Sequence, residues 1–396
     1  MIGRLTGTVQ PYPWGSTTAI PELLGVEPTG EPQAELWLGT HPQGPGRLEG
    51  RDLGDFLAAA PRDRIGAVAV DRFGPRLPYL MKVLAAARPL SLQAHPSREQ
   101  AEQGFAREEA AGIPQDAADR TYRDDWPKPE ALCALEPVQA LCGFRDPAET
   151  YALFRRLGVS SALDLVAPLA DGGAAALAEV FGRLLRLGPD QRDVIDEVVA
   201  AAESIASAGD AELDQFARTA VELARSYPGD PGVIAGLLLN RVGYDAYDAI
   251  FLPAGNLHAY LSGTGVEIMA NSDNVLRGGL TGKHIDVDEL IKVLDFTPLR
   301  PELVPIVEES PGVFGYRTPA PEFGLWRLEP GGSTVELPGP GTGRVLLVVA
   351  GSVTLSGTGR ELTLGRGESA FVTADAADPQ VTGHGTAFVG GPGRAD

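Results

Sequence analysis

The sequence predicts a mainly β protein with a helical insertion, in which a β part lies on each side of the helices. Three observations support this fold class. Short β-type runs separated by Gly and Pro fill most of residues 1–145, an Ala- and Leu-rich stretch covers residues 147–227, and short strands with glycine turns return after residue 300. A chain of 396 residues is too long for one ordinary core, so two or three domains are expected.

In the first part, residues 35–39 and 80–84 have the composition of strands. The Glu- and Ala-rich stretch at residues 100–118 interrupts the strands and has a higher helix propensity. A change of structure is predicted at Asp146-Pro147-Ala148-Glu149. There, an N-cap residue, a proline at the first helical position and an early acidic residue begin a helix.

Helices are expected to continue to about residue 227, and the apolar residues between 194 and 205 recur at helical spacing. A Pro- and Gly-rich turn at 227–232 ends this pattern, and a β-type run follows at 247–252. Near the C-terminus, alternating runs before a glycine turn are typical of a second β barrel or jelly roll. The predicted domains are a first β domain (1–145 and 232–300), an inserted helical domain (146–231) and a second β domain (301–396).

The composition is that of a globular protein with a strongly acidic charge balance. Hydrophobic residues make up 43% of the chain and charged residues 22%. The 33 Lys and Arg against 53 Asp and Glu give a net charge of −20, which repels polyanions, so nucleic-acid binding is not expected. Because the same field repels small anions, a phosphorylated substrate would need a local cluster of Lys and Arg.

Cysteine usage and apolar runs bear on the expected compartment. Cys133 and Cys142 are too few for a disulfide scaffold, and the first residues contain no charged-then-apolar signal sequence. The best apolar run, residues 345–350, is far shorter than the roughly 20 residues that span a bilayer. A cytoplasmic protein without a membrane segment is therefore expected.

Four residues have side chains that could bind a metal ion. If residues 91–95 form a strand, alternation places Ser91, Gln93 and His95 on one face, although an exposed strand ending at a proline turn would give the same pattern. His258 follows a glycine turn and Glu130 lies in Lys128-Pro129-Glu130; a barrel-rim histidine and a solvated loop are the alternatives. Two imidazoles, a carboxylate and a carboxamide could bind Zn²⁺, but their spacing alone does not decide it.

A cluster of polar residues occupies positions 265–281. Arg277 precedes two glycines and could present its planar guanidinium on an uncluttered loop, suited to a phosphate group or a developing enediolate. A structural salt bridge to Asp273 is the alternative.

Taken together, these segments resemble the type I mannose-6-phosphate isomerase family. Four signatures occur in the family's order, and the last of them is highly specific. They are Tyr12-Pro13-Trp14-Gly15 with Glu35-Leu36-Trp37 and Gly39-Thr40-His41-Pro42; Leu80-Met81-Lys82-Val83-Leu84 through residues 91–96; Lys128-Pro129-Glu130; and residues 255–261 running into residues 266–281.

The resemblance implies a cupin jelly roll that carries the metal, an inserted helical domain, and a second cupin that binds no metal and holds the single histidine His384. It implies one zinc ion per chain, with Gln93, His95, Glu130 and His258 as ligands. Substrate-binding residues are expected at Ser91, Lys82, Lys128 and Arg277, and catalytic residues at Arg277, Lys128, Asp273 and Glu267.

The implied reaction interconverts mannose 6-phosphate and fructose 6-phosphate through a cis-enediol, with Zn²⁺ polarising the carbonyl or stabilising the enediolate oxygen. The proton carrier stays open among Lys128, Asp273, Glu267 and metal-bound water. Two departures concern pocket detail: Trp126-Pro127 stands where members usually have Asn-His, and Thr281-Gly282-Lys283 where they usually have Thr-Pro-Lys.

Three other functions fit parts of the pattern. A cupin isomerase for another sugar phosphate would use the same enediol chemistry. A non-catalytic, metal-holding sugar-binding cupin is the alternative from another class, and the presence of Lys128 and Arg277 beside all four ligands argues against it. A metal-dependent dioxygenase is less favoured, because such sites usually contain more histidines. The sequence does not decide between a monomer and a homodimer.

Overall fold

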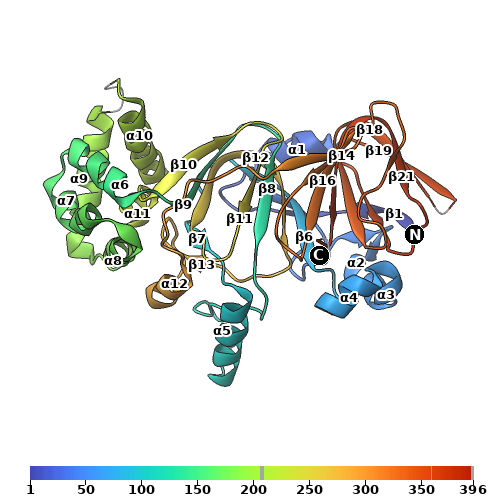
Figure 1. The fold of residues 1–396 in the computed structure, drawn as a ribbon, viewed down its shortest axis with the longest axis horizontal. Helices are drawn as coiled ribbons and strands as arrows, with labels where there is room; N and C mark the ends of the chain where they lie inside the picture. Colours follow the sequence, from blue (N-terminus) through green and yellow to red (C-terminus); the bar gives the residue numbers. More distant parts are fainter. Residues whose placement is uncertain (206–208, 358, 394–396) are drawn as a thin grey trace.

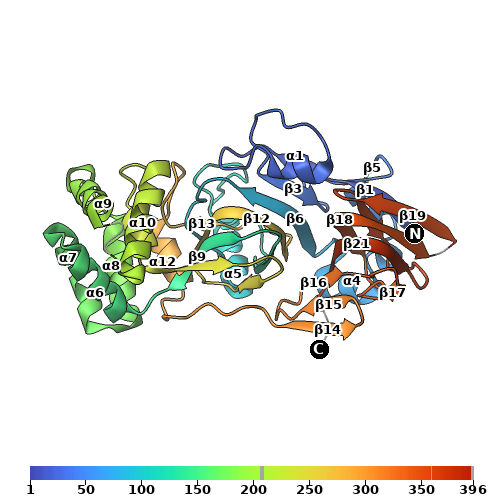
Figure 2. The same ribbon diagram turned by 90° about the horizontal axis from the view of Figure 1, so that it is seen from above.

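The computed structural model describes residues 1–205, 209–357 and 359–393. A helical part, a central β part and a C-terminal β part follow one another along the long axis of the molecule (Figures 1 and 2). The predicted fold class, mainly β with a helical insertion, is confirmed. The last residues of the predicted C-terminal domain, 394–396, lie outside the described residues. In the described part of the chain, no helix has the length and apolar character needed to cross a membrane.

The central part is a ten-stranded antiparallel sheet. Its longest strand, β12, pairs with β6, β7, β8 and β9, so four segments distant in sequence meet along one strand. The strands are β2 (Thr8–Gln10), β3 (Glu35–Leu38), β6 (Tyr79–Ala86), β7 (Gln93–Ala94), β8 (Glu130–Ala134), β9 (Val138–Phe144), β10 (Leu239–Tyr244), β11 (Ala249–Leu252), β12 (His258–Ala270) and β13 (Leu276–Arg277).

The C-terminal part is an eleven-stranded sheet that also recruits the start of the chain. β1 pairs with β20, with Ile2 opposite Val372, so the first residues belong to the C-terminal sheet. The predicted domain limits stay a prediction. The strands are β1 (Ile2–Thr6), β4 (Arg47–Leu48), β5 (Arg51–Asp52), β14 (Ile306–Ser310), β15 (Val313–Tyr316), β16 (Gly324–Leu328), β17 (Val335–Glu336), β18 (Arg344–Gly357), β19 (Arg360–Gly365), β20 (Ser369–Val372) and β21 (Gln380–Gly391).

The helical insertion leaves the central sheet between the neighbouring strands β9 and β10. The predicted start of its first helix is confirmed, because the Asp146 carboxylate accepts from the backbone N–H groups of Ala148 and Glu149 at 2.9 and 3.0 Å. The insertion comprises α6 (Pro147–Leu157), α7 (Ser160–Val166), η1 (Ala167–Asp171), α8 (Gly173–Leu185), η2 (Pro189–Gln191), α9 (Asp193–Ile205), α10 (Ala211–Ser226) and α11 (Gly232–Gly236).

Among the described residues, six further helices accompany the sheets, and the sequence predicts one of them. The helical stretch predicted near residues 100–118 is present as α5, which begins and ends earlier. Short helices earlier in the chain were not predicted, since each is at most seven residues long and carries little periodic signal. The six are α1 (Ala19–Leu24), α2 (Leu53–Ala58), α3 (Pro61–Arg64), α4 (Ala67–Phe73), α5 (Arg98–Ala110) and α12 (Val287–Val293).

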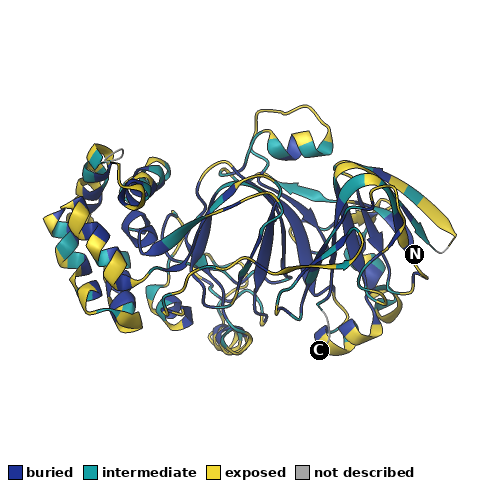
Figure 3. Cartoon of the chain, turned by 45° about the horizontal axis from the view of Figure 1, so that its top comes forward, coloured by how far each residue is buried: buried dark blue, intermediate teal, exposed yellow. Residues whose placement is uncertain are grey.

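Strand β6 separates the hydrophobic core from a cavity. All eight of its residues are buried, and successive side chains point to opposite faces of a strand. Met81 and Val83 pack into a core that includes Phe388 of the C-terminal sheet, whereas Lys82 and Leu84 line the cavity. Figure 3 shows that burial extends through the strands of both β parts. The central sheet therefore has one apolar face and one face available for chemistry.

Tyr79 on β6 ties the two β parts together, because its buried hydroxyl lies 3.1 and 3.0 Å from the carbonyl oxygens of Gly343 and Gly390. We predict that Tyr79→Phe lowers the free energy of unfolding by about 1–3 kcal/mol, since it leaves buried carbonyls without their donor. The measurement is the midpoint of thermal unfolding. Tyr151→Phe, at a partly buried tyrosine of the helical insertion, is the matched control. Equal midpoints for the two variants would contradict the prediction.

Candidate active site and metal centre

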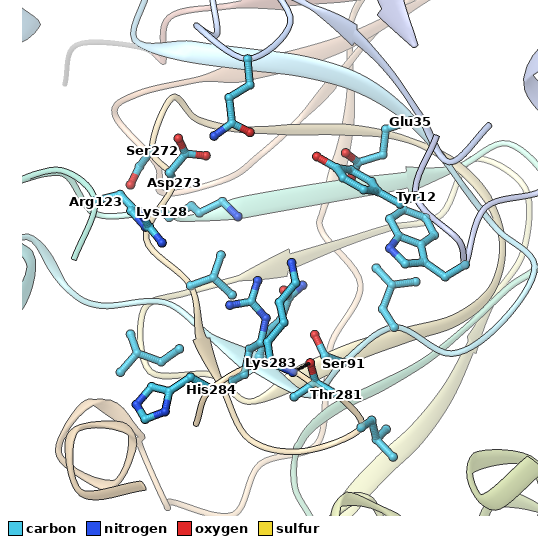
Figure 4. A pocket seen from close by; sticks show the side chains of 18 of the residues that line it. Tyr12, Glu35, Ser91, Arg123, Lys128, Ser272, Asp273, Thr281, Lys283 and His284 are labelled. Carbon is cyan, nitrogen blue, oxygen red and sulfur yellow. Dashed lines mark hydrogen bonds between the residues drawn. The ribbon is translucent and has the colours of Figure 1, made fainter. Parts of the chain in front are cut away.

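A cavity of about 1280 Å³ opens at the inner face of the central sheet. Its wall includes eight of the residues predicted to form the site: Lys82, Ser91, Gln93, Lys128, Glu130, Glu267, Asp273 and Arg277. Figure 4 shows Arg123, Lys128 and Asp273 on one side of the cavity, and Tyr12 with Glu35 on the other. The remaining two predicted residues, His95 and His258, are buried next to Glu130.

His95, Glu130 and His258 converge beside this cavity, which Glu130 lines. The Nε2 atoms of His95 and His258 lie 3.3 and 3.4 Å from the same oxygen of Glu130, Oε2. The three residues are 1%, 2% and 2% exposed, and none of these three atoms has a hydrogen-bond partner among the described residues. Because buried polar atoms without partners are rare and costly, a cation between them is the arrangement that satisfies all three.

The opposite ring nitrogens fix the tautomers of both histidines. Nδ1 of His95 lies 2.8 Å from the Asn274 carbonyl oxygen, and Nδ1 of His258 lies 3.1 Å from the Asn256 carbonyl oxygen. A carbonyl only accepts, so each Nδ1 carries the hydrogen and each Nε2 presents a lone pair. Burial lowers the pKa of His95 to about 4, which keeps the imidazole neutral near neutral pH. Histidine ligands of metals are commonly oriented in this way.

Glu130 is ionised despite its burial. Burial alone would raise the pKa of the carboxyl group, but the Lys128 ammonium group holds it well below its usual range. The Lys128 Nζ lies 3.0 Å from Glu130 Oε1. One carboxylate oxygen thus meets an ammonium group, and the other has no hydrogen-bond partner among the described residues. A set of two histidines and one glutamate is typical of catalytic zinc sites with an open position.

Backbone pairing sets Gln93 beside this cluster. In the β7–β12 pair Gln93 is opposite His258, and in the β13–β7 pair Arg277 is opposite Gln93. Residues directly opposite one another share a face, with Cβ atoms about 4.5–5.5 Å apart. Gln93 therefore lies on the same face as His258, between it and Arg277. Its role as a ligand stays a prediction.

The alternation proposed for this segment is present, although only Gln93–Ala94 is strand. Ser91 and Gln93 line the cavity, while Leu92 and Ala94 belong to the hydrophobic core shared with the helical insertion. The alternative of an exposed strand face is wrong, because His95 is fully enclosed.

Lys82 lies between two buried carboxylates on another wall of the cavity. Its Nζ is 3.5 Å from Glu35 Oε1 and 3.3 Å from Glu267 Oε2. Burial alone would lower the pKa of Lys82, but these carboxylates raise it, so the ammonium group stays charged. Burial raises the pKa of Glu267 to about 7. Glu35, whose Oε2 accepts from Trp37 Nε1 at 2.7 Å, belongs to the Glu35-Leu36-Trp37 signature, which by itself predicts no role for it.

Asp273 pairs with His41 rather than with Arg277. The Gln43 backbone N–H donates to Nδ1 of His41 at 3.2 Å, so Nε2 carries the ring proton and donates to Asp273 Oδ1 at 3.0 Å. Burial alone would raise the pKa of Asp273, but the His41 hydrogen bond and the nearby lysines lower it below its usual value. The structural alternative of an Arg277–Asp273 salt bridge is not formed among the described residues. His41 belongs to the Gly39-Thr40-His41-Pro42 signature, yet no local sequence pattern indicates that Asp273 is its partner.

A group of cations without acidic partners lies at the cavity wall near Arg277. Burial, and then the charge of Arg123, lower the pKa of Arg277. Lys283 is affected in the same way, by burial and then by Arg277 and Arg123. Within residues 1–205, 209–357 and 359–393, none of the three forms an ion pair; Arg123 donates to the carbonyls of Gln115 and Ala117. This cationic cluster (Arg123, Arg277 and Lys283) is the local positive charge that a phosphorylated ligand would need.

The Trp126-Pro127 departure is absorbed in the core. Trp126 is 3% exposed, and the Arg76 guanidinium lies 3.5 Å from its ring centroid. Its carbonyl accepts from Asn274 Nδ2 at 2.8 Å and Ser272 Oγ at 3.2 Å. These hydrogen bonds hold the backbone in place just before Lys128 and Glu130. With Trp126-Pro127 in this position, both residues still line the cavity.

Fold and site together define a class: a protein of two antiparallel β parts that has, among the described residues, one buried His–Glu–His cluster able to hold a metal ion, beside a cavity lined in part by cations. Comparison with known proteins identifies the family. A family model described as "Phosphomannose isomerase type I, catalytic domain" matches residues 2–147. Mannose-6-phosphate isomerase of Escherichia coli is 37% identical over 393 residues, covering 96% of this chain and 97% of the relative. The human protein of the same name is 33% identical, with 94% and 93% covered.

Solved structures agree with the sequence matches. Mannose 6-phosphate isomerase from Salmonella typhimurium, bound to its substrate fructose 6-phosphate and to zinc, superposes with a TM-score of 0.89 at 35% identity, covering 99% of this chain and 100% of the other. The chain belongs to the type I mannose-6-phosphate isomerase family, and the resemblance found in the sequence is confirmed. Its fold is accordingly that of two cupin jelly rolls with an inserted helical part.

The metal centre predicts a linked change in stability. Removing metal should leave three buried polar atoms unpaired, so adding Zn²⁺ at about 100 times its dissociation constant should stabilise the fold by about 2.7 kcal/mol. The measurement is the shift in thermal midpoint of chelator-treated protein on titration with Zn²⁺. His258→Ala should abolish the shift, and His384→Ala, at the exposed histidine of the C-terminal sheet, should preserve it. A full shift in His258→Ala would contradict this site.

Proposed function

We propose that this chain is a zinc-dependent aldose–ketose isomerase that interconverts mannose 6-phosphate and fructose 6-phosphate through a cis-enediol. The observation that carries the proposal is the buried His95–Glu130–His258 cluster, whose Glu130 lines the same cavity as a cationic cluster that has no acidic partner among the described residues. Membership of the family supports the same reaction.

The proposed zinc ligands are His95, Glu130 and His258, with Gln93 as the fourth. Zinc bound there supplies a Lewis acid that polarises the substrate carbonyl and stabilises negative charge on the enediolate oxygen. Lys128 balances the charge of Glu130 through its 3.0 Å contact and offers further donors to a sugar oxygen. Solved structures of the Salmonella typhimurium enzyme include alanine variants at one lysine, two histidines and one glutamate, the residue types gathered here.

The cationic cluster is the proposed site of the phosphate group. A guanidinium can bind phosphate oxygens in a bidentate manner, and Arg277 lies one strand from Gln93 and two strands from His258. Ser91 and Lys82 are proposed to bind sugar hydroxyl groups. A substrate anchored at Arg277 would then extend toward the metal centre, which aligns its reactive carbons with the groups that move protons.

Glu267 is the proposed group that carries the proton between C1 and C2. A pKa of about 7 allows it both to accept and to return a proton near neutrality, which general acid–base catalysis favours. Lys82, held beside it at 3.3 Å, stabilises its ionised form when the proton leaves. Asp273, fixed by His41, is proposed to hold a sugar hydroxyl.

The proposed location is the cytoplasm. Cys133 and Cys142 are both free and buried, and burial raises the pKa of each thiol to about 12, so neither is suited to form a disulfide. Such thiols fit a reducing compartment.

The test of the proposed reaction is a coupled assay of fructose 6-phosphate formed from mannose 6-phosphate, run on metal-stripped protein before and after adding Zn²⁺. Turnover should be absent before addition and restored by it, because carbonyl polarisation depends on the metal. Binding of Zn²⁺ without turnover would contradict the substrate assignment, and the same protein would then be assayed with other hexose and pentose phosphates.

Arg277→Ala should leave the zinc content unchanged and lower kcat/KM by about 100-fold or more, since it removes the guanidinium that is proposed to anchor the phosphate group and thereby to align the reacting carbons. Zinc content is measured by elemental analysis and turnover by the coupled assay. Arg300→Ala, at an arginine whose side chain is 89% exposed, is the matched control and should behave like the unmodified protein. Near-normal turnover of Arg277→Ala would eliminate its proposed role.

A further inference from the structure

The turn near the end of the helical insertion is hydrogen-bonded to the loop that follows Arg277. This contact is made by Asp230, in the turn between α10 and α11. Its Oδ1 accepts from the backbone N–H groups of Gly232 at 2.7 Å and Leu280 at 3.1 Å, and its Oδ2 accepts from Thr281 at 3.1 Å. One carboxylate thus joins two backbone segments about 50 residues apart in sequence.

The loop after Arg277 has a backbone conformation at Gly279 and Leu280 that a leucine rarely adopts. Leu280 has φ of 53°, in the left-handed region that residues with a Cβ rarely adopt. Gly279 has φ of 118°, and a Cβ there would lie 2.6 Å from the Gly232 Cα, so the two turns touch without side chains. The reversal buries the Leu280 side chain completely in the core of the helical insertion. It also leaves Thr281 and Lys283 at the cavity.

Further hydrogen bonds connect the same turn and loop to the segment that carries Ser91. The Tyr227 hydroxyl donates to the Pro89 carbonyl at 2.8 Å. The Gly278 N–H donates to the Leu92 carbonyl at 2.8 Å, and the Leu92 N–H donates to the Gly279 carbonyl at 3.1 Å. The turn at 227–232 therefore holds both segments from which the substrate-facing side chains of this wall project.

Asp230 acts on the cations through the backbone and not as their counter-ion. In the described part of the chain it forms no ion pair with Arg277 or Lys283, and its oxygens face three N–H groups. The nearby positive charge is therefore left for an anion from solution, while the loop that presents it is held rigid. A carboxylate paired directly with Arg277 would instead compete with that anion.

We propose that Asp230 is a positioning residue for the phosphate group of the substrate, and that the helical insertion contributes to substrate binding through it. The carboxylate holds residues 280 and 281 in place and thereby fixes Arg277 on one side of the turn and Lys283 on the other. The inference rests on the proposed function for the identity of the anion, whereas the grip on the loop is independent of it.

The test compares Asp230→Ala and Asp230→Asn in the zinc-loaded protein. We expect Asp230→Ala to raise the KM for mannose 6-phosphate and the inhibition constant of inorganic phosphate together, by about tenfold or more, with a smaller change in kcat and an unchanged zinc content. Asp230→Asn keeps one acceptor oxygen, for the N–H groups of Gly232 and Leu280. Its two constants should therefore lie between those of the unmodified protein and those of Asp230→Ala. A purely structural role would give no such joint rise.

Asp146→Ala is the matched control, because Asp146 also belongs to the helical insertion and also accepts from two backbone N–H groups. It should lower stability without changing KM or phosphate inhibition. The proposal is overturned if both constants of Asp230→Ala stay within about twofold of the unmodified protein, or if Asp146→Ala changes them equally. If Asp230→Ala does not fold, the same criteria apply to Asp230→Asn.

Failure of the proposed function gives a different result from failure of this inference. If the unmodified protein does not turn over mannose 6-phosphate, binding of inorganic phosphate to the zinc-loaded protein is measured by calorimetry. A weaker affinity in Asp230→Asn than in Asp146→Ala would still support the positioning role, and equal affinities would overturn it.

Discussion

The active-site region depends on the burial of one ionised carboxylate, that of Glu130. An isolated charge at 2% exposure would be prohibitively costly, so each of its neighbours must compensate. Lys128 meets one oxygen, and the two imidazoles turn their lone pairs toward the other because backbone carbonyls hold their Nδ1 hydrogens. A cation then completes the cluster. Strand β12 brings these residues together. It pairs with β7 at His258 and with β8 at Met269, which lies opposite Glu130.

Local signals allowed the fold to be predicted where the physics is local. The helix after Asp146 was predictable because an N-cap acts within three residues, and the helix at α9 was predictable from its apolar spacing. The pairing of β1 with β20 was not, because nothing near Ile2 indicates a partner 370 residues away. The proposed metal ligands follow from the family resemblance, since their spacing alone is ambiguous. His41 and Glu35 were given no role because their partners, Asp273 and Lys82, lie on other segments of the chain.

The change to Trp126-Pro127 is compatible with an intact site because the essential contacts there are made by the backbone. The Trp126 carbonyl holds the Asn274 side chain, and the Asn274 carbonyl in turn orients His95. The Asn274 Oδ1 also accepts from the Arg123 N–H at 2.7 Å, so the same residue connects Arg123 to His95. Side chains at position 126 can therefore vary as long as they pack. The large ring does so against Arg76 and Phe73.

Charge is distributed along the cavity in a way that orients a ligand. The Lys82 ammonium group is already paired with the carboxylates of Glu35 and Glu267. The cationic cluster, in contrast, has no carboxylate partners among the described residues. A dianionic phosphate is therefore attracted to one wall and repelled from the other, although the whole molecule carries a net charge of −20. Neighbouring strands are about 4.8 Å apart, so Arg277 and His258, two strands apart, have backbones separated by roughly 10 Å. In the proposed function, the six-carbon chain of the substrate bridges this gap, and strand register sets the distance between anchor and metal.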